Sequence, residues 1–410
     1  MAKPAEVRRF ARRILSGFMV LAGLVGVSGP GVAQSSEFRI NTYTDGIQTQ
    51  PRVTSFSDGG FVVVWQSSRS PGSDSNGRSI LARRFDAAAS PVGNDFQINQ
   101  ETTFDQISPL VATMAGDGFV VTWQTRDSSG TFESEGLKAR IFDSSGSSIA
   151  SEFRVEDPAD GPISIQRAVG TVDSGRFAVV WTHQDGDDFF RVFDGQGAPL
   201  TAPVEVNPTG CSASPRLGTV ADVDFVVLWT CSSGPLPVMY QRYAADGTPL
   251  GMELEGPSTQ AVATTPTDFG FVLASFSSEG WSARRYDTAG VPFGSSFALD
   301  NGFRFKTLEN GYVTLLIDND GDRQGVTFSR VSTGGEIISR RMRANLFTAD
   351  DQTNPDVVGL TDGRFVVVWD SRLSDDGDDL WSIRGRVFTD DLFEDGFESG
   401  DVSAWDLEVP

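Results

Sequence analysis

An all-β fold built from seven repeated units is predicted by three features of the sequence. An apolar motif, Phe-Val-Val-Val-Trp at residues 61–65, recurs along the chain. A tight Asp/Asn-Gly turn precedes most copies, and one strand-like segment stands apart near the N-terminus. Short runs of β-branched and aromatic residues are typical of buried strands rather than helices. Regular repetition of such a unit indicates a repeat architecture.

The apolar motif occurs seven times. Clear copies start at Phe61, Phe119, Phe177, Phe225 and Phe365, and degenerate copies occupy residues 271–275 and 312–316. The copies start 58, 58, 48, 46, 41 and 53 residues apart, which suits one four-stranded unit per repeat. Tryptophan ends the five clear copies, as Trp65, Trp123, Trp181, Trp229 and Trp369. We expect these rings to pack between neighbouring units, the alternative being a ring of sugar-stacking aromatics.

The same elements follow one another in each repeat. A short first strand often opens with proline, as at residues 51–53 and 109–111. An Asp-Gly turn such as 58–59 leads into the apolar motif, because these dipeptides tolerate positive φ and favour tight hairpins. A third strand, such as 81–86, and a fourth, such as 95–99, complete the unit.

Arginine recurs on the third strand, at Arg84, Arg140, Arg191, Arg242, Arg285 and Arg386. We expect each stem to pack across its strand and each guanidinium to pair with a carboxylate of the next unit. The alternative is an anion-binding site lined by these groups.

The fourth strand of the last repeat is displaced to the N-terminus. No such segment follows Phe388, but residues 37–41 (Glu-Phe-Arg-Ile-Asn) closely match residues 95–99. A closed ring in which this strand completes the last unit removes the exposed sheet edges that invite aggregation. The sequence therefore predicts a seven-bladed β-propeller over residues 35–390, rather than an open β-solenoid.

The repeats resemble those of bacterial secreted and surface propellers built on Asp-Gly-x-Phe-Val-Val-x-Trp. The resemblance implies the fold but no single activity, because propellers include enzymes, lectins and scaffolds. An acidic tail at 391–410 contains Phe393, Glu394, Gly396 and Trp405. It resembles a short C-terminal tail of exported bacterial proteins, which implies a sorting or surface role.

The N-terminus is predicted to be an export signal. Basic residues at 3–13, an apolar stretch at 14–27 and small residues at 31–33 are typical of a signal peptide spanning residues 1–33. We therefore expect a periplasmic, extracellular or cell-surface protein. No later segment has the length and hydrophobicity of a membrane span.

Composition narrows the chemistry. A formal net charge of -22 argues against nucleic-acid binding, because phosphates would be repelled. One histidine and two cysteines exclude multi-histidine and four-cysteine zinc sites. Cys211 and Cys231 flank one predicted hairpin and are predicted to form a disulfide in an exported protein.

Long acidic loops between the second and third strands are predicted to share one face of the ring. Asp318, Asp320 and Asp322 alternate in a glycine-containing loop, which resembles part of a calcium loop, so calcium is the one cofactor expected. Two similar clusters contain Asp185, Asp187 and Asp188, and Asp375, Asp376, Asp378 and Asp379. Solvated acidic turns are the alternative for all three.

Three functional classes follow. The first is an exported, non-catalytic binding or scaffold propeller that holds a protein or carbohydrate ligand on its acidic, loop-rich face. The second is a secreted glycoside hydrolase or lyase with acidic loop residues as catalysts. The third is a calcium-stabilised structural module of the cell surface. No catalytic residue is assigned from the sequence.

Overall fold

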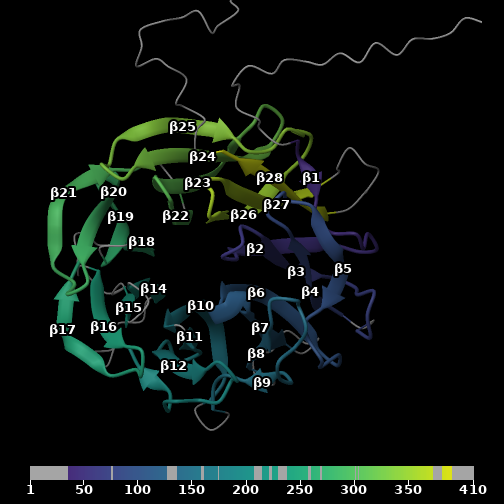
Figure 1. The fold of residues 1–410 in the computed structure, drawn as a ribbon, viewed down its shortest axis with the longest axis horizontal. Coiled ribbons are helices and arrows are strands. Elements are labelled where there is room, and N and C mark those ends of the chain that lie inside the picture. Colours follow the sequence, from purple (N-terminus) through teal and green to yellow (C-terminus); the bar gives the residue numbers. More distant parts are fainter. Residues whose placement is uncertain are drawn as a thin grey trace, which may run out of the picture. The chain divides into compact units, whose positions relative to one another are not determined.

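Seven antiparallel four-stranded sheets form a ring around a central channel in the computed structural model (Figure 1). The first strand of each sheet lies nearest the channel (Figure 1). The structure describes residues 36–74, 77–126, 136–157, 161–173, 175–206, 215–220, 224–229, 238–256, 260–267, 270–300, 302, 304–372 and 381–389. The fold is therefore all-β, and the predicted seven-bladed propeller is confirmed.

The blades are numbered in chain order. Blade 1 contains β2 (Gln48–Ser55), β3 (Phe61–Ser67), β4 (Ser79–Phe85) and β5 (Pro91–Gln97). Blade 2 contains β6 (Asp105–Thr113), β7 (Phe119–Arg126), β8 (Leu137–Phe142) and β9 (Phe153–Arg154). Blade 3 contains β10 (Ile163–Asp173), β11 (Arg176–His183), β12 (Asp188–Asp194) and β13 (Val204–Glu205). Blade 4 contains β14 (Arg216–Val220), β15 (Asp224–Trp229), β16 (Met239–Ala244) and β17 (Pro249–Glu255). Blade 5 contains β18 (Gln260–Thr267), β19 (Gly270–Ser277), β20 (Gly280–Asp287) and β21 (Pro292–Ala298). Blade 6 contains β22 (Arg304–Leu308), β23 (Gly311–Asn319), β24 (Gln324–Ser332) and β25 (Ile337–Arg343).

Blade 7 closes the ring with both ends of the described chain. It consists of β26 (Gln352–Gly359), β27 (Phe365–Arg372), β28 (Trp381–Phe388) and the N-terminal β1 (Phe38–Arg39). Phe38 pairs with Gly385, and Arg39 pairs with Arg384, in antiparallel register. The N-terminal strand therefore supplies the missing fourth strand, as the sequence predicts.

Apolar clusters join neighbouring blades. Trp65 of blade 1 lies with Val366 and Val368 of blade 7, and Trp123 of blade 2 lies with Val62 and Val64 of blade 1. All five repeat tryptophans have at most 1% of their surface exposed. Such burial leaves no ring face for a sugar, so these residues hold blades together rather than form a stacking surface.

Several third-strand arginines join blades through backbone carbonyls rather than through carboxylates of the next blade, whereas Arg242 pairs with Asp224 of its own blade at 2.7 Å. The Nη1 atoms of Arg140 and Arg191 donate to the carbonyls of Ile98 (2.7 Å) and Val155 (3.1 Å), which end the fourth strand of the preceding blade. Arg386 contacts the carbonyl of Ala344 in the same way, at 3.2 Å. In blade 1 this position is occupied by Arg83, not Arg84, and its partner is Ile40 (2.8 Å). We call Arg83, Arg140, Arg191 and Arg386 the inter-blade arginines.

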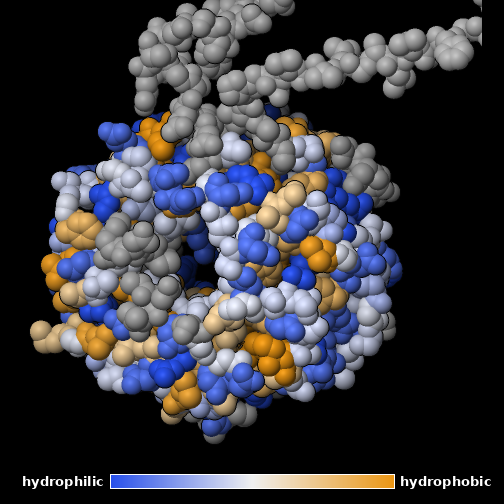
Figure 2. All heavy atoms as spheres, in the orientation of Figure 1, coloured by the Kyte–Doolittle hydropathy of each residue, from blue (hydrophilic) through white to orange (hydrophobic). Residues whose placement is uncertain are grey.

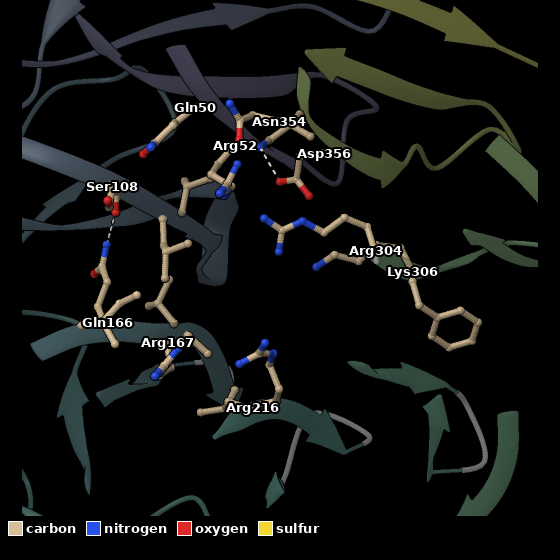
Figure 3. Close-up of a pocket in the computed structure, with 18 residues that line it drawn as sticks. Gln50, Arg52, Ser108, Gln166, Arg167, Arg216, Arg304, Lys306, Asn354 and Asp356 are labelled. Carbon is tan, nitrogen blue, oxygen red and sulfur yellow. Dashed lines mark hydrogen bonds between the residues drawn. The ribbon is translucent and has the colours of Figure 1, made fainter. Parts of the chain in front are cut away.

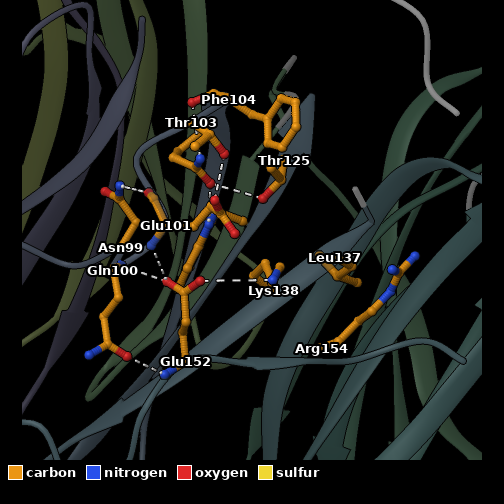
Figure 4. Close-up of polar contacts among 12 residues, drawn as sticks. Asn99, Gln100, Glu101, Thr103, Phe104, Thr125, Leu137, Lys138, Glu152 and Arg154 are labelled. Carbon is orange, nitrogen blue, oxygen red and sulfur yellow. Dashed lines mark hydrogen bonds and ion pairs between the residues drawn. The ribbon is translucent and has the colours of Figure 1, made fainter. Parts of the chain in front are cut away.

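A carboxylate at the start of the fourth strand fixes the connection into its own blade. Glu152 Oε2 accepts hydrogen bonds from the backbone N–H groups of Gln100 and Glu101, and its Oε1 lies 3.8 Å from Lys138 Nζ (Figure 4). Asp95 and Glu37 accept equivalent bonds at 2.7–2.8 Å and 2.7–3.2 Å from two successive backbone N–H groups. The acidic residue that opens these fourth strands is therefore structural.

Several predicted features lie outside the described residues. They are the signal peptide at 1–33, the tail at 391–410, Cys211, Cys231 and the cluster of Asp375, Asp376, Asp378 and Asp379. Across the described ranges, no helix has the length and hydrophobicity needed to cross a membrane.

Candidate functional site

The carboxylates of the predicted calcium loop have separate partners. Asp318 lies in β23 and pairs with Arg341 Nη1 at 2.9 Å. Asp320 Oδ2 accepts from Asn345 Nδ2 at 2.8 Å, and Asp322 Oδ2 accepts from the backbone N–H of Asp350 at 2.8 Å. Within the described ranges, no group of three or more His, Cys, Asp or Glu side chains is arranged to hold a metal ion. Calcium binding by this loop stays a prediction.

The second acidic cluster forms a tight turn between β11 and β12. Asp185 is exposed and Asp187 is half-buried, but Asp188 is fully buried and accepts a 2.6 Å hydrogen bond from Thr182 Oγ1. Asp188 therefore does not belong to the exposed acidic face. The sole histidine, His183, is also buried, at 4% exposure, with its ring 4.5 Å from that of Phe189. It is not the solvated loop histidine that its polar neighbours suggest.

A cavity of about 400 Å³ lies at the centre of the ring. It is lined by residues in the middle of the inner strands β2, β6, β10 and β26 and at the start of β14 and β22. Figure 2 shows the hollow at the middle of the face in view. The inner strands start at the end of the ring from which the loops between second and third strands project. The cavity lies further along most of these strands, within the channel rather than at that end.

Cationic side chains dominate this cavity. Arg52 of blade 1, Arg167 of blade 3, Arg216 of blade 4, and Arg304 and Lys306 of blade 6 line it, with Asp356 of blade 7 as the one carboxylate among the described lining residues. Figure 3 shows Arg167 and Arg216 entering from one side and Arg52 from the opposite side, with Arg304 and Lys306 reaching in between them. The described lining thus carries five cationic groups and one anionic group in a chain of net charge -22.

Four of these groups occupy one structural position. In each case the inner strand pairs with the second strand of its blade, and the residue opposite is the one just before the repeat tryptophan position. The pairs are Arg52 with Val64, Arg216 with Leu228, Arg304 with Leu315 and Asp356 with Val368. Leu110 and Ala168 take this position in blades 2 and 3. The propeller repeat therefore places one residue per blade around the channel, and in this chain several of those residues are arginine.

Backbone bulges fix the side chains at this level. Gln50, Ser108 and Asn354 adopt left-handed φ values of 57°, 55° and 48°, and a proline follows each of them. Residues before proline disfavour helical conformations, and a positive φ on a non-glycine residue persists only where surrounding contacts impose it. One such contact is made by Asp370 Oδ2, which accepts from the backbone N–H of Gln50 at 2.9 Å.

A residue that follows the repeat tryptophan supports the next blade's bulge. Asp370 follows Trp369 and holds Gln50, while Gln66 follows Trp65 and accepts from the backbone N–H of Ser108 at 3.2 Å. Arg52 lies two residues beyond Gln50, so its position in the cavity depends on this arrangement. The strained bulges and their supports rigidly position the inner ends of the strands.

The cavity arginines have few protein partners. Arg52 Nη1 donates to the carbonyl of Pro51 at 2.6 Å, and Arg167 Nε donates to Thr182 Oγ1 at 3.0 Å. In the described part of the chain, Arg304 and Lys306 make no hydrogen bond or ion pair, and the Nε atoms of Arg52 and Arg304 are buried without an acceptor. Guanidinium groups left this way have unused hydrogen-bonding capacity.

Mutual repulsion shows in the pKa values of two of these groups. Burial, and next the charge of Arg304, lower the pKa of Arg52 to about 10, against the attraction of Asp356 and Asp370. Burial, followed by Arg167 and Arg304, lowers the pKa of Arg216 to about 10, against the attraction of Asp188. Both remain protonated at neutral pH, so the cavity holds like charges close together at a cost in free energy. An anion bound between them would relieve that cost.

The sequence contains a signal for this site, although repeat counting from the apolar motif alone misses it. The residues that follow Pro51, Pro215 and Pro355 are Arg52, Arg216 and Asp356. Aligning the repeats on the first strand, rather than on the second, places these residues in one column. Their polar character contrasts with the apolar residues expected on strands near a core.

Comparisons with known proteins support the fold and nothing more specific. No family model and no curated protein matches the sequence. A polysaccharide lyase structure matches with a TM-score of 0.56 and 8% identity, over 87% of this chain and 100% of that chain. A protein of unknown function from Dyadobacter fermentans matches with a TM-score of 0.49 and 11% identity, over 88% of this chain and 99% of that one. A prolyl endopeptidase structure matches with a TM-score of 0.50 and 13% identity, over 80% of this chain but only 46% of the endopeptidase. At these identities, the chain is a seven-bladed propeller that is structurally similar to lyases, hydrolases and proteins of unknown function.

Proposed function

We propose that this protein is an exported binding propeller that holds an anionic ligand at the centre of its ring. The observation that carries the proposal is the convergence of four arginines and one lysine on a single cavity, with one carboxylate among the described lining residues. Arginine forms bidentate, charge-assisted hydrogen bonds with carboxylate, sulfate and phosphate groups. Burial and the mutual repulsion of these cations cost free energy, and a bound anion would offset that cost.

The ligand site lies within the central channel and not on the acidic loops. An acidic exterior repels large polyanions, while the cationic cavity attracts an anion that can enter the channel. The arrangement therefore favours a small anion or the end of an acidic chain. Export, which the predicted signal at 1–33 and the resemblance of the repeats to bacterial secreted propellers support, would expose the cavity to extracellular ligands.

Calorimetric titration of the purified protein with citrate, sulfate and neutral sugars tests this function. We expect binding of the anions only, and a rise in melting temperature when they are present. Arg304→Gln should weaken anion binding about tenfold or more, because a charge-assisted hydrogen bond is lost. Arg69→Gln is the matched control, since Arg69 pairs with Asp45 on the surface, at 61% side-chain exposure. If no anion bound, or if both variants behaved alike, the proposal would fail.

A second candidate is a lyase that acts on an acidic polysaccharide; one structurally similar protein is named a polysaccharide lyase. The observation that favours it is Lys306, which lies exposed in the cavity beside Arg304 and makes no hydrogen bond or ion pair with the described residues. A lyase needs cations to neutralise the substrate carboxylate and a base to remove the adjacent proton. Ultraviolet absorbance from a new unsaturated sugar, lost in Lys306→Met, would establish catalysis. Binding without such absorbance keeps the non-catalytic function.

A further inference from the structure

The cavity cations separate into two groups. Arg167 and Arg216 come from the adjacent blades 3 and 4, and Arg52 comes from blade 1 on the opposite side (Figure 3). Arg304 reaches in from blade 6 between the two groups (Figure 3). It acts on both, since its charge contributes to the lowered pKa of Arg52 and of Arg216. A single compact anion at one side contacts only one of the two groups.

Apolar groups lie between the cationic groups around the same cavity. Leu110 of blade 2, Ala168 of blade 3 and Leu217 of blade 4 line it together with Phe305 of blade 6. Carbon–hydrogen surface of a ligand packs favourably against such a wall, whereas a bare polyphosphate gains nothing there. The cavity therefore suits an organic ligand whose anionic groups are separated by an apolar or partly apolar body.

One carboxylate and neutral amides complete the described lining. Asp356 lies next to the cations, and its Oδ2 accepts a 3.2 Å hydrogen bond from the backbone N–H of Val53. Asn354 and Gln50 add uncharged donors and acceptors on the same side. A carboxylate repels an additional phosphate or sulfate oxygen, but it accepts a hydrogen bond from a hydroxyl group. Asp356 therefore selects a ligand that carries hydroxyl donors beside its anionic groups.

We infer that the ligand is an acidic saccharide with at least two uronate carboxylates, one bound between Arg52 and Arg304 and the other by Arg167 and Arg216. This inference rests on the proposed function, since it names the class of anion that the same cavity takes. Sugar hydroxyls face Asp356 and the neighbouring amides, and the carbon–hydrogen faces of the rings pack on the apolar wall. A cavity of about 400 Å³ is near the lower end of the size range for small-molecule sites, which suits one or two sugar rings.

Titration calorimetry with galacturonate, digalacturonate, a neutral disaccharide and inorganic pyrophosphate tests the inference. We expect digalacturonate to bind at least tenfold more tightly than galacturonate, and the neutral disaccharide to show no binding. Arg216→Gln and Arg304→Gln should each remove the advantage of the second uronate, while the surface variant Arg69→Gln should retain it. Circular dichroism and melting temperature establish that each variant is folded before its affinity is compared.

Asp356→Asn separates a specificity role from a structural one. The substitution keeps an oxygen acceptor and the side-chain shape but removes the charge that repels inorganic anions. We expect the affinity for pyrophosphate to rise about tenfold relative to that for digalacturonate, because the carboxylate that repels the first ligand accepts the hydroxyl groups of the second. A residue with only a structural role would change both ligands alike.

The outcomes distinguish the inference from the proposed function. Absence of binding by every anion would overturn both. Pyrophosphate or sulfate binding as tightly as digalacturonate, or equal affinities for galacturonate and digalacturonate, would overturn the uronate inference and leave anion binding intact. Tight digalacturonate binding that is lost in the two arginine variants would support both.

Discussion

Two sets of arginines in the same ring have opposite surroundings. The inter-blade arginines each donate to a backbone carbonyl of the preceding blade, and each guanidinium lies over a phenylalanine two residues further along its strand. The cavity arginines Arg52, Arg216 and Arg304 instead converge on one another. Each set recurs at an equivalent position in several blades. The two sets differ because the inter-blade position faces the neighbouring blade, whereas the cavity position faces the channel.

The difference is one of hydrogen-bond satisfaction. Charged donors that meet fixed carbonyls stabilise the fold, because the acceptors would otherwise be buried without partners. Charged donors that are crowded together destabilise the fold through burial and mutual repulsion, and proteins keep such groups mainly where a ligand offsets that cost. Each set should therefore respond to removal of its charge in a different way, and the following predictions test this.

The largest effect is expected for an inter-blade arginine. Arg140→Gln removes the 2.7 Å hydrogen bond to the carbonyl of Ile98 and the contact of the guanidinium with the Phe142 ring, 5.3 Å from its centroid. We expect a loss of about 2 kcal/mol in the free energy of unfolding, measured in urea. Anion affinity should stay within about twofold of the wild type. A variant that lost affinity but not stability would show that this arginine belongs to the binding site.

The second largest effect is expected at alkaline pH, which should weaken anion binding in the cavity. The pKa values of Arg52 and Arg216 are lowered to about 10, so their charges are lost as the pH rises through that value. We expect constant anion affinity between about pH 7 and 9 and a fall of about tenfold by pH 11. Calorimetry at fixed ionic strength measures it, and a constant affinity up to pH 11 would contradict it.

Stability is a poor readout for the same titration. Arg52 and Arg216 alone would make the fold more stable between pH 10 and 12.5, because the unfolded chain then holds more protons. Burial raises the pKa of Tyr240 and Tyr243, and those groups act in the opposite direction above pH 10. Affinity is therefore the quantity to follow.

Sequence reasoning succeeds for the fold because its signal is repeated. The Phe-Val-Val-Val-Trp strand and the displaced segment at 37–41 specify seven blades and ring closure, and β1 pairs with β28 as expected. Each copy reinforces the period, and a closed ring is the arrangement that buries all of these apolar strands together.

The candidate site is harder to predict because it is formed by residues far apart in the sequence. Arg52 and Arg304 are separated by 252 positions, and they meet only because ring closure brings their inner strands to one channel. Acidic loops such as the one around Asp320 stand out in the sequence, yet its carboxylate is engaged with Asn345. Charge clusters that are local in sequence are therefore a weaker guide here than single residues at equivalent repeat positions.

Register errors explain the smaller mistakes. Arg84 was expected at the inter-blade position, but β3 pairs Val63 with Arg83, one residue earlier. Residues 83 and 84 are both arginine, so the sequence does not show which of them faces the neighbouring blade. A shift of one residue in strand register exchanges the two faces of a strand.

Removing one cavity charge should stabilise the empty protein. In Arg216→Gln, the repulsion from Arg167 and Arg304 and the cost of burying the charge disappear, while the attraction of Asp188 and the 3.1 Å hydrogen bond to the carbonyl of Pro215 are lost. We expect a net gain of about 1 kcal/mol in the free energy of unfolding without ligand, since partial exposure of Arg216 reduces the repulsion that is relieved. Urea unfolding of the two ligand-free proteins measures the change. A loss of stability would place Arg216 with the inter-blade arginines instead.

The smallest expected effect is a difference in salt dependence between anion binding by the cavity arginines and the stability contributed by the inter-blade arginines. Raising ionic strength from about 0.05 to 0.2 M shortens the range of electrostatic attraction, and anion affinity in the solvent-connected cavity should fall about threefold. The stability lost in Arg140→Gln should not change over that range, because a short hydrogen bond to a neutral carbonyl in the blade interface is little screened. Measuring both quantities in the same buffers compares them directly. If anion affinity were as insensitive to salt as the stability difference, the cavity arginines would bind anions through buried hydrogen bonds rather than through their combined positive charge.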